Sequence, residues 1–215
     1  MTNKPILAIE TSGELCSTAV MLTETTYFEF TIKRKHVHSE MLMTMISDLL
    51  MYSGIELNEC GAIAVSNGPG SFTGLRIGMS AAKGLALGAQ LPIAQVPTFN
   101  ALALQVSDNL NDGEQFVLAN NANVSELYYA KFVKVKNNYD IIDEVSLITK
   151  DKFEEFDLTD TKIFGDYIKN ENALASPNAV SLAKWTYLFG KDLLTYNYEY
   201  IEPNYLKKFV AKEKK

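Results

Sequence analysis

The chain opens with short apolar runs separated by polar residues. Runs at Ile6–Glu10, Cys16–Thr23 and Tyr27–Lys33 have the length of strands, and only brief polar breaks lie between them. Three such runs in succession, joined by tight turns, predict that a sheet begins with antiparallel strands.

From Ser39 onward the pattern changes to an alternation of helices and strands. Ser39 is a suitable helix cap and Gly54 a suitable helix end. The alternation predicts an α/β arrangement, in which a mixed sheet is covered by helices. The elements expected next are a strand at Ala62–Ser66, a helix at about Phe72–Gly88, a strand at Ile93–Val96 and a helix from Thr98 to about Val106.

A polar, turn-rich stretch, Ser107–Gln115, separates this pattern from a second one. We therefore predict two lobes, residues 1–106 and residues 107–215, the second ending in a basic tail. The second lobe is expected to hold three strands (FVLAN, ELYYAKFVKV and DIIDEVSLI), a short helix at DKFEEF, a strand at KIFG, and a helix at Asn178–Lys191 with Val180, Ala183, Tyr187 and Leu188 near one face.

The string SNGPGSFTGLRIG lies between a predicted strand and a predicted helix, and Gly74, Gly78, Gly84 and Gly88 recur along that helix at fours. Each glycine inside a helix costs about 1 kcal/mol relative to alanine, so the group needs a compensating reason. One interpretation is a phosphate cradle at the helix start, although the string fits neither a Walker loop nor G-x-G-x-x-G. The other is close approach of a second backbone, either within this chain or from a partner.

The preceding helix carries more apolar surface than one core contact needs. Met41, Leu42, Met43, Met45, Ile46, Leu49 and Leu50 together cover an arc of roughly 200°. Methionine suits an adaptable contact surface, which favours a partner-binding face. The alternative is a helix sandwiched between two layers of its own chain.

Composition narrows the class of protein. The 215 residues are 47% hydrophobic, with a formal net charge of -6 and an isoelectric point near 5.0. This charge argues against a surface that grips nucleic acid unaided, and the terminal lysines either contact tRNA within an assembly or form a solvated tail. Two cysteines, no leader and no long apolar run predict a cytoplasmic protein with free thiols and no membrane contact.

Five segments, ILAIETS, HSEML, GPGSFTGLRIG, KGLAL and PNYLKK, resemble the bacterial TsaB (YeaZ) family. The resemblance implies an actin-like, sugar-kinase-like ATPase (ASKHA) fold of two lobes, each with a mixed sheet flanked by helices. It also implies a non-catalytic subunit that supports the TsaD transferase in making threonylcarbamoyladenosine on tRNAs that read codons beginning with adenine. A TsaE-like ATPase joins that complex, and this chain is expected to contact tRNA only as part of the complex. The chain alone is expected to form a homodimer.

In this family the first two helices form the pairing surface, so the resemblance places the interface on them. The chain departs from the family pattern at Asn121 and Asn123, which replace an aspartate and an arginine, and at Lys207, which replaces an arginine. The predicted interface residues are Met41, Leu42, Met45, Ile46, Leu49, Ser71, Gly74, Arg76, Gly78 and Met79.

An ATP-dependent phosphotransferase of the same fold is the first alternative. It needs carboxylates that hold Mg²⁺ near phosphate loops from both lobes, and Asn121 stands where the second acid is expected. We expect no intrinsic cofactor, while a nucleotide at a subunit junction stays open. The candidate nucleotide or anion contacts are Glu10, Thr11, Ser12, Gly68 and Gly70.

A metalloprotease is the second alternative. The only histidines, His36 and His38, are two residues apart, no H-E-x-x-H is present and no third ligand is evident, so we expect no metal site. A catalytic triad would need one of the same histidines, and we predict no catalytic residue. Ser71 is interpreted as a helix cap. Arg76 either anchors a carboxylate or phosphate, or pairs with an acid of the neighbouring lobe.

Overall fold

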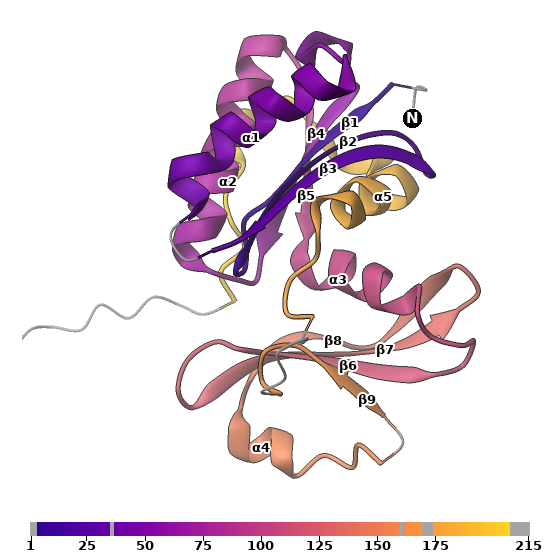
Figure 1. The fold of residues 1–215 in the computed structure, drawn as a ribbon. Helices are drawn as coiled ribbons and strands as arrows, with labels where there is room; N and C mark the ends of the chain where they lie inside the picture. The colour runs from indigo at the N-terminus through magenta and orange to yellow at the C-terminus, as the bar shows by residue number, and fades with distance from the viewer. Residues whose placement is uncertain (1–3, 35–36, 160, 169–173, 207–215) are drawn as a thin grey trace, which may run out of the picture.

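The computed structural model describes residues 4–34, 37–159, 161–168 and 174–206, and it contains two mixed sheets with helices packed on them (Figure 1). The first sheet has the strand order β10-β5-β4-β1-β2-β3. Its centre is parallel and its flanks are antiparallel. Its strands are β1 (Ile6–Glu10), β2 (Leu15–Thr23), β3 (Thr26–Lys33), β4 (Ala62–Gly68), β5 (Ile93–Pro97) and β10 (Leu194–Thr195).

Helices cover both faces of this sheet. The long helices α1 (Val37–Ser53) and α2 (Phe72–Ala89) lie side by side on one face, and α5 (Ala179–Phe189) lies on the other (Figure 1). Alternate residues of β1 serve the two faces: Leu7 belongs to the core under α1 and α2, whereas Ala8 belongs to the core on the side of α5. This alternation follows from the two-residue period of a strand.

The second sheet has the order β8-β7-β6-β9 and carries one helix on each face. Helix α3 (Thr98–Ser107) packs between the two sheets, and the short α4 (Lys150–Glu154) covers the outer face (Figure 1). The described residues also form 3-10 turns at Leu57–Glu59, Lys191–Leu193 and Tyr198–Tyr200. The strands are β6 (Gln115–Asn121), β7 (Glu126–Val135), β8 (Asn138–Thr149) and β9 (Lys162–Phe164).

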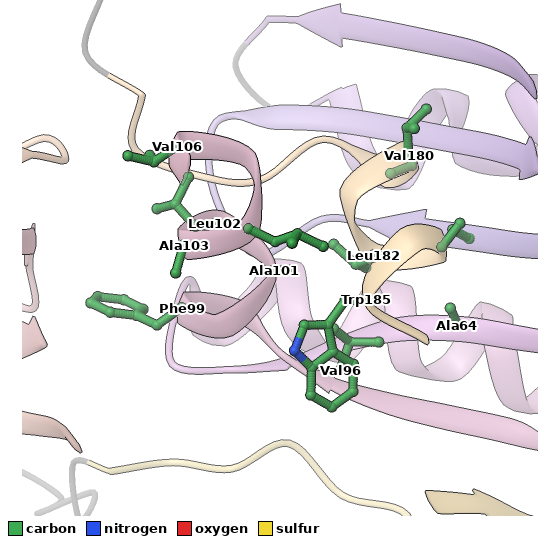
Figure 2. Close-up of a cluster of buried hydrophobic side chains, with 14 of the residues drawn as sticks. Ala64, Val96, Phe99, Ala101, Leu102, Ala103, Val106, Val180, Leu182 and Trp185 are labelled. Atoms are coloured by element: carbon green, nitrogen blue, oxygen red, sulfur yellow. The ribbon is translucent and has the colours of Figure 1, made fainter. Parts of the chain in front are cut away.

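The largest core cluster joins the two sheets through α3 and α5. Figure 2 shows Phe99 and Leu102 of α3 on the same side of the first sheet as Leu182 and Trp185 of α5. Phe116 of β6 completes the cluster from the second sheet. Helix α3 is buried on nearly all sides, as expected of a helix between two layers.

The α/β class and the order of the expected strands and helices are confirmed, with two differences in detail. Helix α1 begins at Val37, so Ser39 lies in its first turn rather than at its cap. In α5, Val180 and Ala183 are buried, whereas Tyr187 and Leu188 are exposed, so the four residues expected near one face do not share one buried environment.

The division into residues 1–106 and 107–215 stays a prediction. Strand β10, from the second of these ranges, pairs with β5 of the first sheet, and Ile201 belongs to the core beneath α1 and α2. The chain therefore crosses from the second sheet back to the first after β9. Within the described ranges, none of the helices combines the length and the apolar character needed to cross a bilayer.

Candidate functional site

The glycine-rich loop joins β4 to α2 and lies against the turn between β1 and β2. It contains a cis peptide bond between Gly68 and Pro69. Ser71 caps α2, because its hydroxyl accepts a hydrogen bond from the Gly74 N–H at 3.2 Å. The Ser71 N–H donates in turn to the Ser12 carbonyl at 2.7 Å, which fixes the loop to the turn.

Three glycines of this region are required by a contact inside the chain. A Cβ at Gly70 would lie 2.6 Å from the Ser12 carbonyl oxygen, and one at Gly74 or Gly78 would overlap Thr11. The Thr11 hydroxyl donates to the Gly74 carbonyl at 2.8 Å. These glycines therefore let the start of α2 approach the end of β1. Their contacts fit the interpretation in which the close approach is within this chain.

The other two glycines of α2 have a different environment. Gly84 and Gly88 are exposed, and a Cβ at either position would meet no atom within 4 Å. Leu87, between them, is 67% exposed. A shallow hollow of about 360 Å³ lies beside both glycines and reaches the Leu57–Glu59 turn. Nothing in the described part of the chain requires glycine at these two positions.

The candidate anion contacts of the β1–β2 turn are closed to solvent. Glu10, Thr11 and Ser12 are buried, and Ser12 donates to Glu10 Oε1 through both its N–H and its hydroxyl. Among the described residues, neither Glu10 Oε2 nor Ser66 Oγ has a hydrogen-bond partner of good geometry. Burial raises the pKa of the Glu10 carboxyl to about 7.

The β1–β2 turn packs against the segment that leads into α5. A Cβ at Gly13 would lie 2.6 Å from the Ser176 Cβ, and the Ala179 N–H donates to the Ser17 hydroxyl at 3.0 Å. Contact of Glu10, Thr11, Ser12, Gly68 and Gly70 with a nucleotide stays a prediction.

Most of the predicted interface side chains of α1 lie in the chain's own core. Met45 is 3% exposed, and Leu42, Ile46 and Leu49 are as deeply buried, because α1 packs on the first sheet and beside α2. Met79 of α2 is buried in the same cluster. The sandwiched-helix alternative thus accounts for these residues, and Met41 is only partly covered. The apolar residues that α1 and α2 expose are Met43, Met51, Tyr52, Phe72 and Leu87.

Arg76 lies in a cluster with aromatic side chains that was not predicted from the sequence. Its guanidinium carbon is 3.9 Å from the centroid of the Phe72 ring, and its Nε–H donates to the Tyr205 hydroxyl at 3.0 Å. It therefore makes no ion pair with an acid of the second lobe in the described residues. The spacing of Phe72 and Arg76, four apart on a helix, was a signal available in the sequence.

The two asparagines that depart from the family pattern make local contacts. The Asn121 N–H and side-chain amide both donate to Asp166, the latter at 3.1 Å to the carboxylate. The Asn123 side-chain oxygen Oδ1 accepts hydrogen bonds from the Ser125 and Glu126 N–H groups, each at 2.9 Å, and so closes the turn between β6 and β7. Both side chains hold this loop in place.

The described residues contain no group of three or more histidine, cysteine, aspartate or glutamate side chains arranged to hold a metal ion. His38 is hydrogen-bonded through Nε2 to the Leu15 carbonyl oxygen at 3.0 Å, whereas His36 lies outside the described residues. Both cysteines are buried and free, and burial raises the pKa of each thiol to about 11. The lysine tail, residues 207–215, also lies outside the described part of the chain.

Comparison with known proteins gives consistent matches. The family model of TsaD, tRNA N6-adenosine threonylcarbamoyltransferase, matches residues 30–199. The tRNA threonylcarbamoyladenosine biosynthesis protein TsaB of Haemophilus influenzae is 38% identical over 137 residues, which is 63% of this chain and 57% of that protein. The protein of the same name from Escherichia coli is 38% identical over 132 residues, 61% of this chain and 56% of that protein.

The chain thus matches little more than half the length of these two relatives. Among solved structures, YeaZ from Pseudomonas aeruginosa superposes with a TM-score of 0.78 at 24% identity, over 94% of this chain and all of that one. This likeness shows that the two chains share a fold.

Proposed function

Because the chain belongs to the TsaB (YeaZ) family, which is related to TsaD, we propose that it is a non-catalytic subunit of the machinery that makes threonylcarbamoyladenosine in tRNA. Its role is to bind and support a TsaD-like transferase. In this proposal the transferase carries out the reaction and contacts the tRNA, and a TsaE-like ATPase joins the assembly.

The observation that carries the proposal is the open face of α2. Gly84 and Gly88 together cost the helix about 2 kcal/mol relative to two alanines, and no contact inside the described chain offsets that cost. Small residues on an exposed helix let a second helix approach closely, and Leu87 between them supplies apolar contact area. The docking surface is therefore the outer side of the α1–α2 layer.

The interface residues are revised accordingly. Ser71 and Arg76 are exposed and remain on the proposed surface, whereas Gly74, Gly78 and the buried α1 side chains support the layer from inside. The same surface is proposed to pair two copies of the chain when the transferase is absent. Self-pairing and transferase binding then compete for one face.

The buried Glu10 supports a role without catalysis. A phosphotransferase needs an acid that reaches a solvent-filled nucleotide site, and this carboxylate is covered on all sides by its own chain. The buried β1–β2 turn instead supports the start of α2, which is hydrogen-bonded to it.

The proposal is tested by titrating the full chain into the TsaD-family protein of the same organism in a calorimeter. The Leu87→Asp variant should lose binding, because a charge would enter an apolar contact, while it keeps its melting temperature. Leu188→Asp is the matched control, since Leu188 is 46% exposed on α5, across the sheet from α2. Normal binding by Leu87→Asp, or ATP turnover by the isolated chain, would contradict the proposal.

A further inference from the structure

The exposed end of α2 carries a guanidinium that is held in place by two aromatic rings. Arg76 Cζ lies 3.9 Å from the Phe72 ring centroid and 5.9 Å from that of Tyr205, and the two rings are themselves 5.1 Å apart. The Arg76 Nε–H donates to the Tyr205 hydroxyl at 3.0 Å across 129 residues of sequence. The side chain is therefore fixed before any partner arrives.

Tyr205 is itself held by a C-terminal strap, residues 194–206, that runs along α2 (Figure 1). The strap begins as β10 on β5, and the Tyr198 hydroxyl donates to the Leu91 carbonyl at 2.7 Å near the end of α2. The side chain of Ile201 is buried in the core, and the Asn204 N–H donates to the Asn67 carbonyl at 2.6 Å. The strap thus fixes Tyr205 at the start of the helix.

The Arg76 guanidinium has further N–H donors, on its two Nη atoms. Only Nε is engaged, and within the described ranges neither Nη atom of Arg76 has a hydrogen-bond acceptor or a carboxylate within ion-pair distance. The other arginine, Arg34, is paired with Glu40. With Nε turned toward Tyr205, the two Nη groups form the free edge of the planar fork, the edge that matches a carboxylate.

We propose that Arg76 anchors the partner interface by binding a carboxylate side chain of the docking protein, with Tyr205 as the residue that positions it. This inference rests on the proposed function, which supplies the partner. The surroundings fit a protein contact: Phe72 and Tyr205 are each over a third exposed, and an arginine between aromatic rings is the composition of an interface hot spot.

Preorganisation gives the anchor its strength. An exposed arginine normally loses side-chain entropy when it is ordered on binding, and this arginine is already ordered by the stack and the hydrogen bond. A lysine at the same position would keep the charge but would lack the fork and the planar stack. The proposal therefore distinguishes an anchoring role from a general effect of charge.

The test measures the affinity of the full chain for the TsaD-family protein of the same organism by calorimetry. Arg76→Ala and Arg76→Lys should each weaken binding by about tenfold or more, with unchanged melting temperatures. Arg34→Ala is the matched control, because it removes the same charge from a guanidinium that already has a carboxylate partner. It should bind within about twofold of the wild type.

Tyr205 is tested through a double-mutant cycle. Tyr205→Phe keeps the ring and removes the hydroxyl that accepts from Arg76, and it should weaken binding by about three- to tenfold. The same change in the Arg76→Ala background should have no effect, because Tyr205 acts only through the guanidinium. Tyr200→Phe, on an exposed tyrosine of the same strap, should leave the affinity unchanged.

Three results would overturn the inference. Binding by Arg76→Ala within twofold of the wild type, together with loss of binding by Leu87→Asp, would retain the proposed function and remove the anchor. Weaker binding of Arg76→Ala to unmodified tRNA, with protein binding unchanged, would assign the guanidinium to a phosphate instead. Failure of the wild-type chain to bind the transferase would remove the proposed function and the inference with it.

Discussion

The hydroxyl of Thr11, at the end of β1, donates a hydrogen bond of 2.8 Å to the carbonyl of Gly74 in the first turn of α2. The two residues are 63 positions apart, and their contact is close enough that Gly74 has no room for a Cβ. The glycine string therefore serves first to seat α2 on the end of the central strand. Any surface that α2 presents outward is positioned from this point.

Gly74→Ala should destabilise the chain. The added Cβ would overlap the Thr11 carbonyl oxygen, a backbone atom that cannot move aside like the end of a flexible side chain. We expect the free energy of unfolding in urea to fall by about 2–3 kcal/mol. A free energy of unfolding within about 0.5 kcal/mol of the wild type would show that Gly74 does not pack directly against Thr11.

The double variant Gly84→Ala, Gly88→Ala should change stability and binding in opposite directions. Both positions are helical and open, so the free energy of unfolding should rise by about 1–2 kcal/mol. The added methyl groups should also hold a partner helix away and lower its affinity. Urea denaturation and calorimetric titration measure the two effects, and tighter binding by the double variant would argue against close helix approach.

Stability should fall between pH 5 and pH 8 because of Glu10. Burial raises the pKa of this carboxyl from its ordinary 4.5 to about 7, so the folded state holds a proton that the unfolded state releases. As pH rises from 4.5 through 7, the folded state must lose that proton, at a cost approaching about 3 kcal/mol.

Glu10→Gln should flatten this part of the stability curve and be more stable than the wild type at pH 8. Glu14→Gln, an exposed glutamate of the same turn, is the control and should leave the slope unchanged. Urea titrations at pH 5, 6, 7 and 8 measure the slope. Identical slopes for the wild type and Glu10→Gln would rule out Glu10 as its source.

Met45→Asp should unfold the chain, and not merely abolish its binding to a partner protein. Met45 is 3% exposed on the buried side of α1, so the variant would bury an unpaired charge and lose more than about 3 kcal/mol of stability. Met43→Asp, two residues earlier on the same helix and 55% exposed, should stay within about 0.5 kcal/mol of the wild type. Circular dichroism during thermal unfolding distinguishes the two variants.

The order of strands and helices followed from the sequence because each element carries its own period. The apolar run of β1, the glycine string after β4 and the apolar α3 are local patterns, and the structure forms the expected element at each of them. The resemblance to the family likewise rested on short sequence motifs, which need no tertiary structure to be recognised. Local residue order was enough for these conclusions.

Burial and long-range contacts were decided only by the tertiary structure. A helical wheel counts the apolar residues of α1, but it does not say how many neighbouring layers cover them, and the sheet and α2 together cover most. Gly74 and Gly84 look alike in the sequence, yet one faces Thr11 and the other faces open space. Arg76 and Tyr205 are 129 residues apart, and their contact depends on the return of the chain to the first sheet through β10, which no local pattern encodes.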